Sequence, residues 1–401
     1  MVECRFPEGN FKLGLIGILP SLFLSKSFSG IRFQSWKPGD FVRMLIHQQC
    51  LEALMRRAKV GGILFWSLEN IRYLCGFTGG DGVLIAAGQE RTFMSDSRYK
   101  EQARQETRDA TFRKYTRKEE GVARFIQSLR VKRLGFESAA IPYESYRKLK
   151  EKLSRVSLVP LTGEIARLRI RKEPEELENI RRAIQIASQS FLDTLGRFKP
   201  GVRERVVAEW LEWRMRRRGG ERTSFDTIVA SGPRAALPHG LASEKRMQEK
   251  ETVVVDFGVR FKGYCSDETK TLVLGEPETK QKKIYEIVRR AQDRAMRAIR
   301  PGVNVRQIDA AAREVIARAG YGKFFGHGTG HGVGLAVHEE PTISPRGRGV
   351  VEEGMVFTVE PGIYIPGWGG VRLEDMVLVT ARGCEVLTVL SKDLKENIYA
   401  R

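Results

Sequence analysis

Cysteine is scarce in this chain, and the few residues present do not form a recognisable framework. There are five among 401 residues, an odd number that argues against a set of paired disulfides. No C-x-x-C pair occurs, so a zinc ribbon is not indicated. This usage fits a reducing compartment, and we expect a cytoplasmic protein. The five are Cys4, Cys50, Cys75, Cys265 and Cys384.

Long hydrophobic runs are also absent. The apolar stretch at residues 11–24 is interrupted by Pro20 and is too short to span a bilayer as a helix. It is a poor export signal, because Glu3 and Glu8 lie where such signals carry positive charge. We therefore interpret residues 1–43 as an upstream extension and expect no association with a membrane.

Acidic residues are outnumbered, with 49 Asp and Glu against 69 Lys and Arg and a formal net charge of +20. A basic surface is the electrostatic footprint of nucleic-acid binding. Here the basic residues are spread along the whole chain, and clusters such as residues 214–218 lie inside helical patterns. They lack the interleaved aromatic residues that stack on bases. We interpret them as solvated helix faces and expect no specific nucleic-acid partner.

The length of the chain suits two domains. Helix and strand patterns alternate over residues 44–165, which predicts a small α/β domain. The second domain is expected at residues 170–401, where two helix pairs are each followed by strands, a pattern that favours a duplicated α+β half. We expect helices at 51–59, 97–106, 174–195, 203–218, 281–298 and 305–319, and strands at 61–66, 84–87, 91–94, 252–258, 264–274, 355–360 and 376–380.

Two aspartates flank a hairpin pattern in the second domain. Asp256 follows a run of valines, and Asp267 lies eleven residues further along the chain. If residues 260–263 form the tip, Asp256 lies opposite Asp267, with Cβ atoms roughly 4.5–5.5 Å apart. Two like charges so close repel each other unless a proton or a metal ion lies between them. Taken alone, the pair could equally be two solvent-facing residues on an edge hairpin.

Histidine is as scarce as cysteine, but four of the five histidines lie between positions 239 and 338. Residues 326–335 read Gly-His-Gly-Thr-Gly-His-Gly-Val-Gly-Leu. Glycine there lets the backbone approach closely and adopt positive φ, which suits a crowded site. Glu360 closes an apolar strand and Glu374 follows fourteen residues later, and a carboxylate beside a hydrophobic strand is costly without a partner. With the aspartate pair and His331, these glutamates predict a metal centre.

Charge counting favours two cations at this centre. The four carboxylates carry four negative charges, which two divalent ions with a bridging hydroxide nearly balance. Oxygen-rich ligation with one imidazole suits Mn²⁺, Co²⁺ or Fe²⁺, and Zn²⁺ also fits. Paired metal sites hold their ions roughly 3.5–4 Å apart and generate a nucleophilic hydroxide near neutral pH. We expect a hydrolase with two divalent metal ions, with Mn²⁺ as the first choice.

These residues and the phrases around them resemble the pita-bread metallopeptidases. The phrases are Val-Val-Asp-Phe-Gly, Ser-Asp-Glu-Thr, the glycine and histidine segment, and Thr-Val-Glu-Pro-Gly-Ile-Tyr. Residues 69–79 and 96–99 are similar to the amino-terminal creatinase/prolidase domain of the proline-specific members. The resemblance implies an α+β fold with two pseudo-symmetric halves around a strongly curved antiparallel sheet. It also implies a homodimer that hydrolyses the Xaa-Pro bond at the amino terminus of peptides.

The resemblance assigns a role to each candidate ligand. Asp256 would bind one metal ion, and His331 with Glu360 would bind the other. Asp267 and Glu374 would bridge both ions. The activated hydroxide would then attack the scissile carbonyl group.

The remaining roles are also carried over from the resemblance. Glu360 would move a proton to the leaving proline nitrogen. His239 and His338 would bind the substrate and stabilise the tetrahedral intermediate, and donors aimed at developing charge contribute about 3–4 kcal/mol. His327 would line the pocket, and Arg372 would orient the metal ligands.

Two positions depart from the pattern of the family. Lys270 stands where many relatives carry Arg, and Arg234 stands where many carry Asn. Both are expected to flank the site and to affect specificity more than metal binding.

Several rival functions remain within this resemblance. Creatinase-like members have lost the metal ligands that this chain keeps, and methionine aminopeptidases normally lack the amino-terminal domain. An Xaa-Pro dipeptidase (prolidase) that acts only on dipeptides is hard to separate by sequence, and an Xaa-Pro aminopeptidase is the first choice. A non-catalytic binding protein on the same fold is a minor alternative. Such members usually have incomplete sets of metal ligands, whereas this chain keeps all five.

Overall fold

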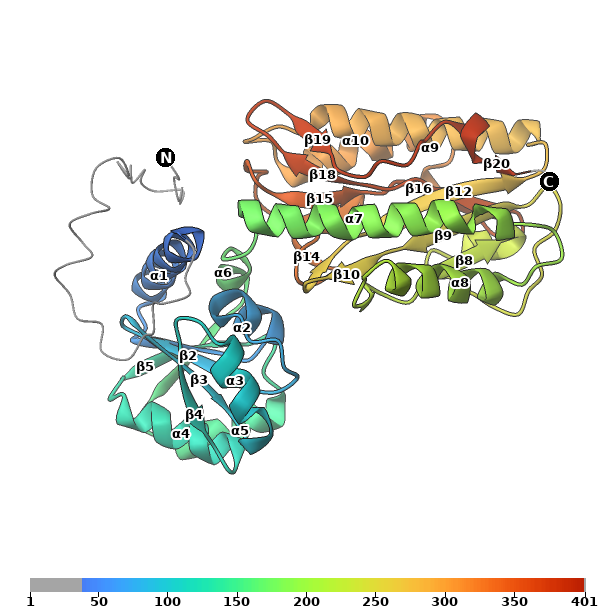
Figure 1. Ribbon diagram of the computed structural model, residues 1–401. Helices are drawn as coiled ribbons and strands as arrows, with labels where there is room; N and C mark the ends of the chain where they lie inside the picture. The colour runs from blue at the N-terminus through green and yellow to red at the C-terminus, as the bar shows by residue number, and fades with distance from the viewer. Residues whose placement is uncertain (1–37, 400–401) are drawn as a thin grey trace. The chain divides into compact units, whose positions relative to one another are not determined.

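The computed structural model describes residues 38–399, so most of the predicted extension at residues 1–43 lies outside the described residues. The chain divides into two compact units, one ending at Leu168 and the other beginning at Arg169, and each is drawn in Figure 1. Within the described range, no helix combines the length and the apolar character that a membrane crossing needs.

The first unit is built on a mixed sheet with the strand order β4-β3-β2-β1-β5-β6. β1 is antiparallel to β2 and parallel to β5, which agrees with the predicted α/β pattern. Its core joins Leu64 and Ile85 of the sheet to Val122 and Leu149 of two helices. The elements are α1 (Pro38–Ala58), β1 (Gly62–Phe65), α2 (Leu68–Cys75), β2 (Val83–Ala87), β3 (Glu90–Ser95), α3 (Lys100–Glu106), β4 (Thr111–Lys114), α4 (Lys118–Ser128), β5 (Arg133–Glu137), α5 (Tyr143–Lys152), β6 (Ser157–Leu161) and α6 (Gly163–Ala166).

The second unit begins with a helix pair that packs on strands. Pro174 occupies the first turn of α7, and Glu173 and Glu176 form a capping box that satisfies its free backbone N–H groups. Phe191 of α7 stacks on Phe257 of β9 with ring centroids 4.9 Å apart. The elements of this half are α7 (Pro174–Thr194), α8 (Glu204–Arg217), β7 (Arg222–Thr223), β8 (Ile228–Ser231), β9 (Thr252–Phe257), β10 (Val259–Phe261), β11 (Tyr264–Cys265) and β12 (Glu268–Leu274).

A second helix pair and its strands repeat this plan. α9 and α10 pack side by side, and their buried residues join those of β15, β17 and β18 in one core (Figure 1). The antiparallel sheet of this half has the order β14-β13-β15-β18-β19. Its elements are α9 (Thr279–Ala298), α10 (Val305–Arg318), β13 (Gly330–Gly332), β14 (Glu339–Ile343), β15 (Val356–Val359), β16 (Gly362–Ile365), β17 (Gly369–Arg372), β18 (Asp375–Val379), β19 (Cys384–Val386) and β20 (Ile398–Tyr399). The predicted α+β fold with duplicated halves is confirmed.

The predicted register of the aspartate hairpin is wrong. Asp256 pairs with Thr269, not with Asp267, and Phe261 pairs with Tyr264. The tip is therefore only Lys262 and Gly263, whose φ angles of 45° and 83° fit a tight two-residue turn. The shorter tip moves Asp267 two positions along the ladder, and the strand is interrupted around it.

Candidate metal centre

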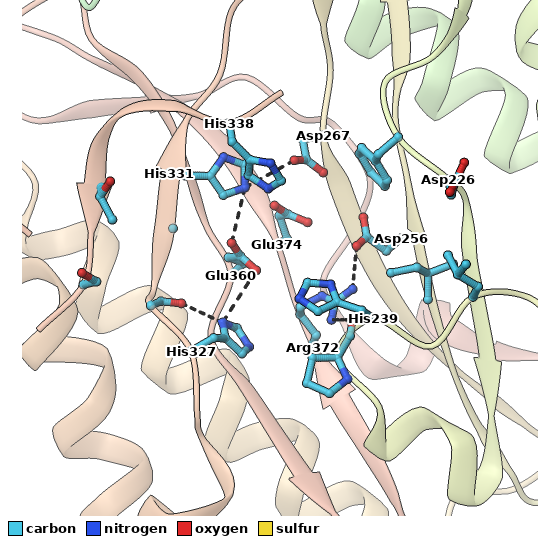
Figure 2. A pocket seen from close by; sticks show the side chains of 18 residues that line it. Asp226, His239, Asp256, Asp267, His327, His331, His338, Glu360, Arg372 and Glu374 are labelled. Atoms are coloured by element: carbon cyan, nitrogen blue, oxygen red, sulfur yellow. Dashed lines mark hydrogen bonds and ion pairs between the residues drawn. The ribbon is translucent and has the colours of Figure 1, made fainter. Parts of the chain in front are cut away.

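A cavity of about 430 Å³ opens among the strands of the second unit. Figure 2 shows side chains from both halves converging on it, with the aspartates on one side and the histidine-rich segment on the other. The nine predicted site residues all line this cavity, namely His239, Asp256, Asp267, His327, His331, His338, Glu360, Arg372 and Glu374.

The candidate ligands lie in or directly beside short, buried strands. Asp256 lies near the end of β9, and Asp267 directly precedes β12. His331 is the middle residue of β13, Glu360 directly follows β15, and Glu374 directly precedes β18. Because these strands are held by hydrogen-bonded ladders and buried apolar residues, they fix the position of each side chain before any ligand binds.

Four of the five candidate ligands lie within a few ångströms of one another. The Nε2 atom of His331 lies 3.6 Å from Asp267 Oδ2 and 3.5 Å from Glu360 Oε1. Asp267, His331 and Glu374 each offer a ligand atom within 4.8 Å of the others. Asp256 faces this group across the cavity (Figure 2).

The tautomer of His331 suits metal binding. Its Nδ1 atom lies 3.1 Å from the carbonyl oxygen of Gly332 and donates a hydrogen bond to it. The Nε2 atom, which faces the carboxylates, then carries the lone pair. Burial and the neighbouring His338 lower the pKa of His331 to about 4, so the ring is neutral at physiological pH.

The buried carboxylates of the site repel one another, and their pKa values are raised. Burial raises the pKa of Asp267 and Glu374 well above the usual range, and the neighbouring carboxylates raise both further. Burial likewise raises the pKa of Glu360 to about 7. One buried oxygen, Asp256 Oδ1, has no hydrogen-bond partner among the described residues. A buried polar atom without a partner is costly, and a cation would satisfy it.

Arg372 fixes the aspartate side of the cavity. Its Nη2 atom donates to Asp256 Oδ2 at 2.6 Å, and its Nε atom donates to the hydroxyl group of Thr269 at 3.0 Å. Thr269 in turn donates to Glu374 Oε2 at 2.6 Å. The guanidinium group also reaches the hydroxyl group of Tyr364 at 3.1 Å. Arg372 thus orients two candidate ligands, one directly and one through a threonine.

Thr269 and Tyr364 were missed by sequence reasoning. The hydroxyl group of Tyr364 lies 2.8 Å from His327 Nε2, so it joins His327 to Arg372. Burial raises the pKa of Tyr364 to about 12, which keeps it a hydrogen-bond donor. Thr269 could have been found from the sequence, because residues two apart in a strand share a face and Thr269 lies two residues after Asp267.

The other histidines lie around the cavity at different depths. The ring centroid of His338 lies 4.3 Å from that of His331, and Figure 2 shows His239 on the aspartate side. Burial lowers the pKa of His327 to about 4 and also lowers that of His338. His327 and His338 are therefore neutral near pH 7, when each can donate one hydrogen bond.

The glycines of the histidine segment other than Gly326 are closely approached by neighbouring atoms. A Cβ atom on Gly330 would overlap the carbonyl oxygen of Thr358, and one on Gly332 would overlap that of Glu340. No glycine between residues 326 and 335 has a positive φ angle, so that part of the prediction is wrong. Within the segment, Gly330–Gly332 form the short strand β13, whose pairing with β14 shifts register between His331 and Gly332, and neighbouring backbone leaves no room for a side chain at either glycine.

The two departures from the family pattern lie outside the cavity wall. Arg234 donates to Glu204 Oε2 at 3.0 Å and to the carbonyl oxygen of Leu241 at 2.5 Å, so it holds the loop that carries His239. Lys270 is buried and does not line the cavity, and its expected effect on specificity stays a prediction. Its side chain points away from the site because alternate residues of a strand face opposite sides.

The donor set fits divalent cations. Four carboxylates and one imidazole with a free lone pair are oxygen-rich ligands of the kind that Mn²⁺, Co²⁺ and Fe²⁺ accept. The unpartnered oxygen of Asp256 and the raised pKa values of Asp267 and Glu374 both indicate that positive charge between these groups would be favourable. The residues present are therefore compatible with a pair of metal ions.

Comparison with known proteins agrees with this geometry. Residues 178–381 match the model of metallopeptidase family M24, and residues 48–171 match the creatinase/prolidase N-terminal domain. The chain is 41% identical over 345 residues to an uncharacterized peptidase of Bacillus subtilis, covering 86% of this chain and 98% of that protein.

Solved structures extend the similarity to the whole architecture. An Xaa-Pro dipeptidase from Bacillus anthracis aligns with a TM-score of 0.85 at 40% identity, covering 89% of this chain and all of that one. An X-Pro aminopeptidase from Thermotoga maritima aligns with a TM-score of 0.78 at 36% identity, covering 87% of this chain and all of that one. The chain therefore belongs to metallopeptidase family M24, with an amino-terminal creatinase/prolidase domain ahead of a pita-bread domain.

Proposed function

We propose that this protein is a metal-dependent Xaa-Pro aminopeptidase that removes the first residue from peptides with proline in second place. Its relatives include both Xaa-Pro dipeptidases and an X-Pro aminopeptidase, so the family alone does not separate the two activities. What separates them physically is the group that follows proline. A dipeptide ends there in a free carboxylate, whereas a longer peptide continues as a neutral amide.

The observation that carries the proposal is the lack of a spare cationic side chain among the described residues of the cavity wall. Arg372 is the single Lys or Arg among the described residues that line it. Each nitrogen of its guanidinium group already donates a hydrogen bond within the protein. The Nε atom donates to Thr269, the Nη1 atom to Pro238 and Tyr364, and the Nη2 atom to Asp256. A carboxylate taken out of water needs a charged partner, while an amide does not.

The rest of the wall is also unsuited to a free carboxylate. Thr342 and Ser344 are neutral, and Asp226, an exposed acid, would repel a second negative charge. Phe225, Ile228 and Leu241 supply apolar surface that fits a proline ring or an apolar first residue. This wall favours peptides longer than two residues.

The ligand roles in this proposal are those that the resemblance implies. Asp256, Asp267, His331, Glu360 and Glu374 would hold the two cations, with Mn²⁺ as the proposed ion. Two bound divalent cations make a water molecule nucleophilic near neutral pH and polarise the scissile carbonyl group.

The protein residues supply the remaining chemistry. Glu360, whose pKa is raised to about 7, can accept a proton at a carboxylate oxygen and pass it to the leaving proline nitrogen. His338 and His239, on opposite sides of the cavity, donate hydrogen bonds to peptide oxygens as negative charge develops. Arg372 keeps Asp256 and Glu374 in place during the reaction.

Three substrates test the proposal in the Mn²⁺-loaded protein: Ala-Pro-Ala, Ala-Pro and Ala-Pro amide. We expect kcat/KM for Ala-Pro-Ala to exceed that for Ala-Pro at least tenfold, because only Ala-Pro brings an unpaired carboxylate into the cavity. The amide should recover much of the lost rate, since it removes that charge without lengthening the peptide. A preference for Ala-Pro over both others would assign the protein as a dipeptidase, and no Xaa-Pro hydrolysis at all would exclude both activities.

A further inference from the structure

A buried cluster of charges lies behind the candidate metal centre. Lys270, Glu268 and Asp375 are each only 1% exposed. The ammonium nitrogen of Lys270 lies 3.1 Å from Glu268 Oε1 and 3.8 Å from Asp375 Oδ1, and it donates to the carbonyl oxygen of Leu390 at 2.9 Å. None of the three charged residues lines the cavity, and none has a role in the chemistry described above.

The two acids of the cluster directly follow two candidate ligands in the chain. Asp267 is followed by Glu268, the first residue of β12, and Glu374 is followed by Asp375, the first residue of β18. Because successive side chains of an extended segment point to opposite sides, each pair sends one carboxylate into the cavity and the other behind it. A shift of either hidden acid would therefore move a candidate ligand.

The two strand starts are also joined to each other. The backbone N–H of Glu374 donates to the carbonyl oxygen of Thr269 at 3.2 Å, and the N–H of Asp267 lies 3.3 Å from the sulfur of Met376. Lys270 is the group that contacts the acids of both strands. Its position ties β12 of the first half to β18 of the second.

Each hidden acid has a further partner from the helix that covers its own half. Ser188 of α7 donates to Glu268 Oε2 at 3.0 Å, and Gln292 of α9 donates to Asp375 Oδ2 at 3.0 Å. Lys392, with its side chain 23% exposed, also approaches Asp375 Oδ2 at 2.8 Å. The arrangement repeats in the two halves, and Lys270 lies where the repeats meet.

The charge of Lys270 is needed in this position. Burial alone would lower its pKa, but the carboxylates of Glu268 and Asp375 outweigh burial and raise it, so the ammonium group stays protonated. Without Lys270, a buried carboxylate at Glu268 would keep only a serine hydroxyl group as a described side-chain partner. A buried charge that loses its partner is strongly destabilised, and the strand relaxes or the acid takes up a proton.

We propose that Lys270 is a positioning residue for the metal centre, because it neutralises Glu268 and Asp375 together and thereby fixes Asp267 and Glu374. The inference rests on the proposed function, in which those two carboxylates would help to hold the cations. It concerns geometry at the ligands, so its direct readout is metal affinity. Outer groups that orient metal ligands typically change affinity about 10- to 100-fold when removed.

The test compares Mn²⁺ binding by isothermal titration calorimetry in the full-length protein and three variants. Lys270→Met should bind Mn²⁺ about 10- to 100-fold more weakly than the unaltered protein. Lys270→Arg keeps the charge and should recover most of the affinity. Lys245→Met is the matched control, since Lys245 forms a partly buried ion pair with Glu251 at 2.6 Å and does not line the cavity. It should lower stability without changing Mn²⁺ affinity.

Each outcome decides the inference. Equal Mn²⁺ affinity and stoichiometry in Lys270→Met and the unaltered protein would overturn it, as would an equal loss in Lys245→Met, which would indicate general destabilisation. If the unaltered protein bound no Mn²⁺, the proposed function would fail and the inference with it. If Lys270→Met did not fold, Lys392→Met would replace it, because Lys392 reaches the same Asp375 from a partly exposed position. A several-fold loss of affinity there supports the inference, and no loss contradicts it.

Discussion

The acidic residues at the candidate metal centre outnumber the basic residues beside them. Asp256, Asp267, Glu360 and Glu374 line one cavity, and Arg372 is the one arginine or lysine among the described residues beside them. The pKa values of all four acids are raised by burial, and neighbouring carboxylates raise those of Asp267, Glu360 and Glu374 further. Cations bound between these carboxylates would relieve this repulsion.

Replacing Glu360 by Gln should abolish turnover while leaving the fold intact. The amide is nearly isosteric, but it can neither carry the proton nor ligate as a carboxylate, and loss of a proton-transfer group alone costs about 10²- to 10⁴-fold in rate. Stability of the metal-free protein should be unchanged or slightly higher, because one buried like charge disappears. Steady-state kinetics on Ala-Pro-Ala and urea unfolding measure the two effects. Near-normal rates in this variant would remove Glu360 from the mechanism.

Mn²⁺ affinity should rise with pH between about 6 and 8, since the ligands must lose protons to bind metal. Glu360 has a pKa of about 7, and those of Asp267 and Glu374 are raised well above the ordinary range. The metal-free protein therefore holds protons that the ion must displace, and higher pH removes them in advance. His331, with a pKa of about 4, is already neutral in this range and contributes nothing.

Calorimetry in two buffers of different ionisation enthalpy measures the protons released by metal binding. We expect at least one proton per protein at pH 6.5, and fewer in Glu360→Gln, which has lost one of the titrating acids. Binding without proton release, or affinity that weakens as pH rises, would contradict the assigned ligands.

At the scale of helices and strands, the sequence predicted which elements exist better than it predicted how the strands pair. The periodicity of α7 and the capping residues at Glu173 and Pro174 placed that helix within one residue of its observed end. The hairpin tip was predicted at residues 260–263, but only Lys262 and Gly263 form it, with positive φ angles. The sequence did not show that Arg260 and Phe261 belong to the strand and not to the turn. Which strands lie beside one another, and hence the contacts of Tyr364, depends on tertiary packing that no local pattern records.

The close packing of β13 gives a prediction at this scale. Gly330→Ala should destabilise the protein, since the new methyl group would overlap the carbonyl oxygen of Thr358 in β15. Overpacking of this kind typically costs about 1–3 kcal/mol, and the shift should also disturb His331 and weaken Mn²⁺ binding. Gly326→Ala is the matched control in the same segment, because nothing lies within 4 Å of its added Cβ atom. Equal urea midpoints for the two variants would refute the account of these glycines.

For the whole molecule, part of the basic composition has a local structural use. Arg214 and Arg218 both bind Asp193, which ties α8 to α7. Buried ion pairs near the candidate metal centre are formed by Lys172, Arg169 and Lys270. The sequence revealed the excess charge but not its distribution, because the partners of these residues are distant in the chain.

The boundary between the two units follows from one of these ion pairs. Glu339 lies next to His338 and is held by Lys172 at 3.2 Å and Arg169 at 3.0 Å, while it accepts the backbone N–H of Ala336 at 2.9 Å. Residues 169–172 therefore complete the loop that carries His338, although the family model matches only from residue 178. The second unit should need these four residues for full stability.

Two fragments that differ only in those four residues test this boundary. Residues 169–401 keep Lys172 and Arg169, whereas residues 173–401 keep the α7 cap at Glu173 but leave Glu339 buried without its cations. Removing one side of a buried ion pair costs about 3–5 kcal/mol, so the shorter fragment should unfold at markedly lower urea. Both should bind Mn²⁺ if they fold, since the candidate ligands lie between residues 256 and 374. Full-length Lys172→Met should reproduce the loss of stability, and equal unfolding midpoints for the two fragments would place the boundary after residue 172.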